Sequence, residues 1–128
     1  MNQEELNELA SRIIGAAIEV HKQTGPGLLE SVYEACLMEE LKTRGIKAEQ
    51  QVEIPIIYKG KKLENFYVVD ILVEDEIILE LKCVQELHPI HEVQVVTYLK
   101  LANKRLGYLI NFNVPQLLRG LKRKVNNF

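Results

Sequence analysis

Three strand-like runs in the middle of the chain constrain its fold more than any other feature. Residues Gln51–Tyr58, Phe66–Val73 and Ile77–Val84 are rich in Val, Ile, Leu and Tyr, and such residues favour β-strands. Short polar stretches separate them, with Lys59-Gly60-Lys61-Lys62 in the first and Glu74-Asp75-Glu76 in the second. Because short turns join antiparallel neighbours, this segment predicts an antiparallel three-stranded sheet.

Helical patterns lie on both sides of these strands. Over residues 4–23, apolar side chains recur every three or four positions, which predicts an amphipathic helix. A second helix is expected over about Leu28–Thr43, after the break at Thr24-Gly25-Pro26-Gly27, with Gly45 near its end. A third is expected over about Ile90–Asn103, because Pro89 suits the first turn of a helix.

The C-terminal part adds a strand and a segment of undecided type. Gly107–Asn113 is short and apolar, which predicts a strand, whereas residues 117–125 fit either a strand or a helix. The element order is then α-α-β-β-β-α-β. This order predicts an α/β (α+β) fold with a mixed central sheet flanked by helices.

Length and composition predict one cytoplasmic domain. The 128 residues fit a single domain over 1–128, and a hydrophobic content of 47% argues against disorder. No apolar run approaches the roughly 20 residues that span a bilayer, and the acidic, polar start is unlike a secretory signal. We therefore expect no membrane partner, and we expect Cys36 and Cys83 to be free thiols.

Charge is distributed unevenly along the chain. The net charge of −2 excludes a uniformly basic nucleic-acid binder. Residues 99–128, however, contain seven Lys and Arg residues and no Asp or Glu. Four of these bases lie close together, and we expect them to contact nucleic-acid phosphates: Arg119, Lys122, Arg123 and Lys124. A solvated basic terminus is the alternative interpretation.

Three charged residues interrupt the apolar strands. Glu80 and Lys82 lie within Ile77–Val84, and Asp70 lies within Phe66–Val73. Strand side chains alternate between faces, so Glu80 and Lys82 point the same way, roughly 7 Å apart. Burial of an unpaired carboxylate is costly, so each carboxylate should be paired or bound to a cation.

The length of the loop between these strands decides where Asp70 lies. If residues 74–76 form a three-residue loop, Asp70 faces Glu80 on one side of the sheet, whereas a two-residue loop would place it on the other. Facing carboxylates repel unless a cation bridges them, and their oxygens suit Mg²⁺ or Mn²⁺. Lys82 would then orient a water or stabilise charge on a phosphate. An ion pair of Lys82 with either carboxylate, without chemistry, is the alternative.

Asp70 followed by Glu80-Leu81-Lys82 resembles the motif of the PD-(D/E)XK nuclease superfamily. Its restriction-endonuclease-like core has the element order given above. Val69 stands where the name of the motif has proline. More narrowly, Gly27-Leu28-Leu29-Glu30-Ser31-Val32-Tyr33 resembles the signature of the GxxExxY proteins, a family assigned to that superfamily, and the likeness covers about residues 13–125.

The resemblance implies roles for individual residues. Asp70 and Glu80 would be metal ligands, together with the backbone carbonyl of Leu81, and Lys82 would be the catalytic lysine. Glu30 matches an acidic residue that some members contribute to the metal and to catalysis from the helix before the sheet. A first-turn Glu favoured by the helix dipole is the alternative for Glu30.

The resemblance also implies supporting residues. His91, Gln94 and Tyr98 are three and four positions apart, so they share one helix face. Gln94 and Tyr98 resemble the Gln-x-x-x-Tyr motif of the recombination-exonuclease branch, where both residues support the active site and the nucleic-acid strand. Tyr33, on the helix face of Glu30, joins this set. Core packing of Tyr98 and a surface position for His91 are the alternatives.

These features favour a nuclease that requires Mg²⁺ or Mn²⁺ and hydrolyses phosphodiester bonds of DNA, in DNA repair, recombination or processing, with RNA as the alternative substrate. A catalytically silent module that binds nucleic acid or a protein partner is the second hypothesis, and a scaffold without nucleic acid is the third. A domain of this size offers a limited groove, which is consistent with a homodimer.

Overall fold

A five-stranded mixed sheet organises the chain. The computed structural model describes residues 1–128. The strand order is β1-β2-β3-β4-β5, in which only β3 and β4 are parallel neighbours. The elements in chain order are α1 (Gln3–Thr24), α2 (Glu30–Thr43), β1 (Ala48–Tyr58), β2 (Lys61–Val73), β3 (Ile77–Lys82), α3 (Pro89–Ala102), β4 (Leu106–Asn111), the 3₁₀ turn η1 (Leu117–Gly120) and β5 (Leu121–Val125).

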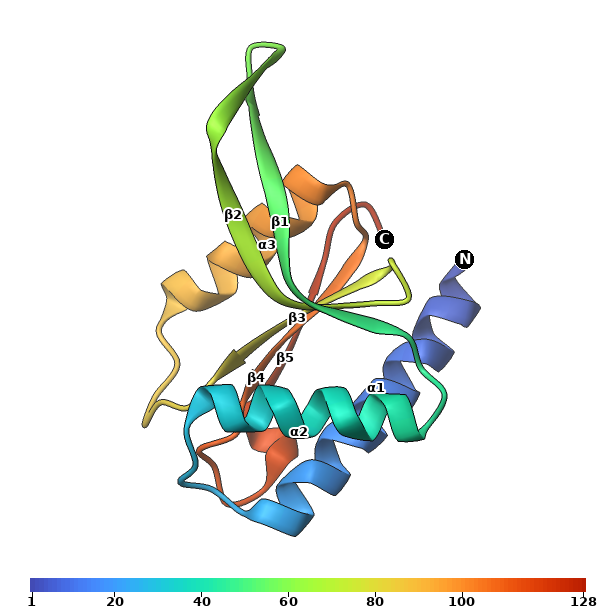
Figure 1. Cartoon of the computed structure of the whole chain (residues 1–128), viewed down its shortest axis with the longest axis vertical. Helices are drawn as coiled ribbons and strands as arrows, with labels where there is room; N and C mark the ends of the chain where they lie inside the picture. The colour runs from blue at the N-terminus through green and yellow to red at the C-terminus, as the bar shows by residue number, and fades with distance from the viewer.

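Helices cover both faces of the sheet, as Figure 1 shows. Helices α1 and α2 pack on one face around a cluster of 21 buried residues, and α3 packs on the other around a cluster of seven. Asn2 caps the start of α1 and forms a capping box with Glu5, and Gly25, whose φ is 67°, caps its end. The mixed sheet flanked by helices confirms the predicted fold class.

The predicted elements are all present, and they differ from expectation mainly at their ends. Both β1 and β2 begin several residues earlier than predicted, because polar residues at their ends still pair across the hairpin. Helix α2 begins at Glu30 rather than at Leu28. The segment of undecided type contains both structures, the 3₁₀ turn η1 and then strand β5. Both cysteines are free, as expected, and no helix is long and apolar enough to cross a membrane.

The β2–β3 hairpin has the register that a three-residue loop predicts. Val73 pairs with Ile77, and the pairing continues to Ile71 and Leu79. The next positions along the two strands are Asp70 and Glu80. The loop length therefore places the two carboxylates opposite each other.

The ribbon of β1 and β2 turns over at Asp70. Ile71 and Val73 pack under α1 and α2, whereas Val69, two positions earlier, packs under α3. Residues two apart in a regular strand share a face, so the facing pattern inverts between Val69 and Ile71. On β1, Gln51 lies between the residues paired with these two and has a left-handed φ of 51°. The two faces of the β1–β2 pair therefore exchange at Asp70, across from the left-handed Gln51.

Beyond this point β1 and β2 continue as a hairpin that projects from the body of the molecule, as Figure 1 shows. Lys59 and Gly60 form its turn, with φ of 49° and 78°. Two successive positive φ values are typical of a type I′ turn, whose twist matches that of the paired strands. We call residues 52–69 the arm.

Tyr33 anchors the loop before α2 to the core. Its side chain is fully buried and its ring stacks on Phe112 with centroids 4.5 Å apart. Its hydroxyl donates to the Gly25 carbonyl and accepts from the Leu28 N–H at 3.3 Å. The loop is thereby fixed in the position from which α2 begins at Glu30.

Tyr33→Phe is expected to lower the free energy of unfolding by about 1 kcal/mol, because the ring is kept and two backbone groups lose their partner. Chemical denaturation measures this change. An unchanged midpoint would show that the hydroxyl does not stabilise the loop.

Candidate active site

Asp70 and Glu80 lie at the centre of the site, on adjacent strands. Each carboxylate reaches across to the other strand's backbone: the Asp70 N–H donates to Glu80 Oε1 at 2.9 Å, and the Leu81 N–H donates to Asp70 Oδ2 at 2.7 Å. Glu80 is 8% exposed, and Asp70 is half-buried. The structure thus brings together the two carboxylates that the sequence predicted to face each other.

Burial raises the pKa of both carboxyl groups. The pKa of Glu80 rises to about 8, first through burial and then through the neighbouring charge of Asp70. Burial also raises the pKa of Asp70, although the Leu81 N–H and the charge of Lys82 act in the opposite direction. Two like charges held close together out of water favour a shared proton or a cation.

The donor set fits a magnesium-type cation. The second oxygen of each carboxylate takes no backbone hydrogen bond. The side chains form no cluster of three or more His, Cys, Asp or Glu groups. Two carboxylates suffice for Mg²⁺, which keeps several waters and binds substrate phosphates in its remaining positions.

Lys82 lies at the end of β3, half-buried, on the same side as Glu80. The four ion pairs of the chain all lie elsewhere. Its ammonium therefore has no carboxylate within the 4 Å of an ion pair, although its charge lowers the pKa values of Asp70, Glu80 and Glu30. Lys82 therefore does not form the ion pair with Asp70 or Glu80 that was the alternative to a catalytic role.

Asn111, which was not among the predicted site residues, positions the segment that follows Lys82. Asn111 is the β4 partner of Lys82 and is 3% exposed. Its side chain donates to the Val84 carbonyl at 2.9 Å and accepts from the N–H groups of Val84 and Asn113 at 3.1 and 3.2 Å. The sequence feature that could have identified Asn111 is its polar side chain at the end of an otherwise apolar strand.

Asn111→Ala is expected to destabilise the chain by about 2 kcal/mol, because three backbone groups lose a buried partner. The chain after Lys82 would also lose its attachment, so catalysis should fall while substrate binding is kept. Chemical denaturation and a separate comparison of kcat and KM measure the two effects. An unchanged kcat in a folded variant would contradict the positioning role.

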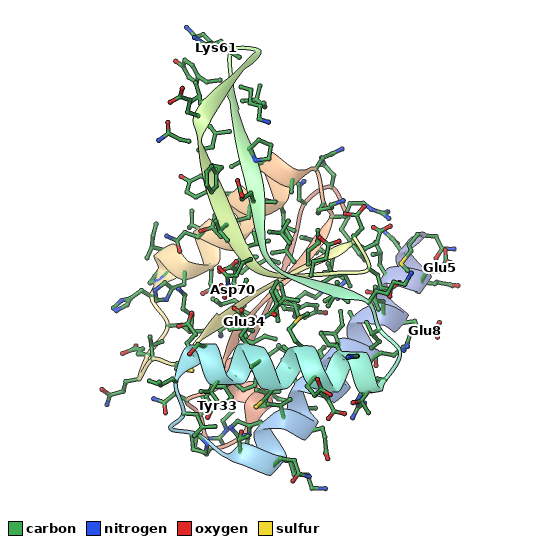
Figure 2. All side chains as sticks on the ribbon, in the orientation of Figure 1. Glu5, Glu8, Tyr33, Glu34, Lys61 and Asp70 are labelled. Atoms are coloured by element: carbon green, nitrogen blue, oxygen red, sulfur yellow. The ribbon has the colours of Figure 1, made fainter.

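Helix α2 and strand β1 add polar groups beside the carboxylates. Glu30, the first residue of α2, is exposed, and the charges of Lys82 and Asp70 both act on its pKa, which burial raises. Glu34, one turn later, accepts from Gln50 and Gln51 at 2.9 Å. Gln51 also contributes to lowering the pKa of Asp70. Figure 2 shows the Asp70 and Glu34 labels near each other in this view, above α2.

Gln51 was not among the predicted site residues, because a left-handed glutamine carries no local sequence signal. The charges of Lys82 and Asp70 act on the Glu30 carboxyl group. The role of Glu30 in metal binding stays a prediction.

Helix α3 places two of its three predicted residues beside the site. Tyr98 is half-buried, and burial, followed by the charge of Glu80, raises its pKa. Burial and then the charge of Lys82 lower the pKa of His91, whose Nδ1 accepts from the His88 N–H at 3.2 Å. Gln94 is exposed and takes part in no side-chain hydrogen bond within the chain. Its role stays a prediction.

Tyr33 supports the site only through the fold. Because its side chain is fully buried, it holds the loop before Glu30 and does not reach a substrate. This narrows its predicted supporting role to a structural one.

The predicted basic surface is divided between two faces of the sheet. Lys124 forms an ion pair with Glu92 of α3 at 2.5 Å, and Lys122 also lowers the pKa of Glu92. Arg123 lies on the opposite face, where it donates to the Tyr108 hydroxyl and to Asn7 of α1 at 2.7 and 2.8 Å. The side chains alternate because the segment is a strand. Arg119, on η1, is exposed.

The guanidinium of Arg123 is thus engaged within the fold, and its contact with nucleic acid stays a prediction. Lys122 and Arg119 remain accessible, and their contact with nucleic acid stays a prediction.

The chain resembles known proteins in sequence pattern and in fold. The family model described as the PD-(D/E)XK nuclease superfamily matches residues 7–124. No curated protein matches the chain. A solved structure titled "Crystal structure of SSO0001" aligns with a TM-score of 0.59 and 22% identity, over 77% of this chain and 51% of that one. The chain thus spans about half the length of that protein, and the likeness concerns the fold.

Proposed function

The chain belongs to the PD-(D/E)XK nuclease superfamily, and on this premise we propose that it is a metal-dependent nuclease that hydrolyses phosphodiester bonds of DNA. The observation that carries the proposal is the convergence of Asp70 and Glu80, each hydrogen-bonded to the backbone of the other's strand. Lys82 lies beside them without an ion-pair partner. Such an arrangement is costly in the protein alone and useful when a cation and a phosphate bind.

The residues have distinct tasks in this proposal. Asp70, Glu80 and the Leu81 carbonyl would hold Mg²⁺ or Mn²⁺, with Glu30 at the edge of the site. When bound, the cation supplies a water of lowered pKa and neutralises charge on the phosphate. Lys82 orients the attacking water and stabilises the negative charge that develops on the phosphate oxygens. Tyr98 and His91 line the site from α3.

We further propose that the chain is a member of the GxxExxY family within the superfamily. Gly27 has a φ of 103°, a conformation that favours glycine. Glu30 begins α2 beside the carboxylates, and Tyr33 fixes the intervening loop from the core. The three residues of the motif thus have three compatible tasks: a turn, an acidic group and an anchor.

DNA is the proposed substrate, and RNA is the alternative that the same chemistry allows. The test is incubation of the wild-type chain with single-stranded, duplex and branched DNA and with single-stranded RNA, in Mg²⁺, in Mn²⁺ and in EDTA. We expect cleavage of DNA that requires the divalent cation. Asp70→Asn is the matched variant, because it keeps the acceptor for the Leu81 N–H and removes the charge.

Two outcomes would overturn the proposal. Cleavage that persists in EDTA or in Asp70→Asn would show that another site or a contaminant cuts the substrate. Binding of nucleic acid without cleavage in any metal would favour the catalytically silent module instead.

A further inference from the structure

The arm exposes aromatic side chains that the packing of the fold does not use. Tyr58 is 61% exposed, Phe66 50% and Tyr67 43%. These residues lie on a two-stranded hairpin that extends past the helices, as Figure 1 shows. Exposed rings gathered on one projecting element mark a surface for binding rather than packing.

Tyr67 and Tyr58 lie on one face of the arm, which continues the face of the sheet that α3 covers. Tyr67 pairs with Ile54, which is buried in the cluster under α3, and Tyr58 pairs with Lys61. Directly opposed residues share a face, and so do residues two apart on a strand. The register shifts between Pro55 and Ile57, so the faces are followed along β1, where Ile54 and Tyr58 are four residues apart. Tyr67, Lys61 and Tyr58 therefore face the same way, and the two rings lie roughly 13 Å apart.

This face is continuous with the site. The Tyr67 ring lies 5.3 Å from the Tyr98 ring, centroid to centroid. Tyr98 is in turn near enough to Glu80 for the carboxylate charge to act on it. Tyr98 and Tyr67 thus connect the site to the arm, and Tyr58 lies farther along the same face toward its tip.

The tip of the arm is positively charged. Lys59, Lys61 and Lys62 are exposed, and none of them forms an ion pair. The Lys59 ammonium lies 5.6 Å from the centre of the Tyr58 ring. Figure 2 shows Lys61 at the tip, far from Asp70. Lysines beside exposed rings suit a ligand that alternates phosphates with flat bases.

We infer that the arm binds a single-stranded segment of nucleic acid next to the site, with bases stacked on Tyr67 and Tyr58 and phosphates bound by Lys59 and Lys61. The inference rests on the proposed function, because it names the form of the substrate. Rings can stack on bases only where these are unpaired, so the arm favours a single strand over an intact duplex.

The test is binding in EDTA, followed by fluorescence anisotropy, of an oligothymidylate and of a blunt duplex of equal length. We expect the double variant Tyr58→Ala/Tyr67→Ala to bind the single strand about 10- to 100-fold more weakly than wild type. Tyr67→Phe keeps a ring and should bind as wild type does. Phe66→Ala is the matched control, because Phe66 is exposed on the other face of the arm.

The lysines are tested by salt dependence. Lys59→Gln/Lys61→Gln should reduce the steepness of log K against log salt by about 1.4, since each lost phosphate contact on a single strand removes about 0.7. Thermal unfolding of each variant verifies that the fold is kept.

Equal binding of the single strand by wild type and the double tyrosine variant would overturn the inference. So would a double variant whose affinity for the duplex falls as much as its affinity for the single strand. A wild-type dimer that the same variant turns into a monomer, with unchanged nucleic-acid binding, would also overturn it and assign the arm to a second copy. Because the assay contains no divalent cation, its result is independent of cleavage. Unchanged binding of the single strand by the arm variant refutes only this inference, whereas absence of cleavage in wild type refutes only the proposed function.

Discussion

Replacement of Lys82 by Met is expected to reduce metal-dependent cleavage about 10²- to 10⁴-fold, the range found for charge-stabilising and proton-handling groups in active sites. The ammonium has no carboxylate partner within 4 Å, so its removal leaves no broken ion pair behind. Methionine keeps the length and the apolar stem of the side chain. We therefore expect a large fall in kcat and little change in stability.

Single-turnover cleavage of a labelled oligonucleotide, with a melting curve of the same preparation, measures both quantities. Lys22→Met is the matched control, since Lys22 is exposed in the last turn of α1 and forms no ion pair. A Lys82→Met variant that cleaves as fast as wild type would remove this lysine from the mechanism. A variant that unfolds instead would indicate a structural role.

Glu80→Gln should stabilise the metal-free chain by about 2 to 4 kcal/mol near pH 7.5. Burial and the charge of Asp70 raise the pKa of Glu80 from 4.5 to about 8 in the folded state. Between these values the unfolded chain binds fewer protons at this position than the folded chain. Stability is therefore full below about pH 4.5 and falls as the pH rises toward 8. Glutamine is neutral throughout and keeps an acceptor for the Asp70 N–H.

The measurement is chemical denaturation in EDTA at pH 5 and pH 7.5. The gain should be large at the higher pH and small at the lower. Glu53→Gln, the same change at an exposed strand position, should alter stability by less than about 0.5 kcal/mol. A destabilised Glu80→Gln variant at pH 7.5 would show that the ionised carboxylate is well accommodated without a cation.

Much of the site could be predicted from the sequence because it depends on short-range rules. The number of residues in the loop Glu74-Asp75-Glu76 sets the register, and the register sets which charges face each other. Alternation along β3 places Glu80 and Lys82 on one side. These relations need no knowledge of the remaining chain.

The parts that could not be predicted depend on distant contacts. The left-handed backbone of Gln51 belongs to a residue type with no preference for it, so only the structure reveals that the ribbon turns over at Asp70. Asn111 binds the chain after Lys82 from 27 residues away along the chain. The division of the basic segment depended on whether residues 117–125 form a helix or a strand, which the sequence left open.

The central claim is that Asp70 and Glu80 together bind the cation that the nuclease needs. A titration with Mn²⁺, followed by the loss of the free-ion signal in electron paramagnetic resonance, tests it most directly. We predict saturable binding to the wild-type chain, and loss of that binding in Asp70→Asn and in Glu80→Gln in parallel with loss of cleavage. Equal Mn²⁺ binding by wild type and both variants would contradict the account.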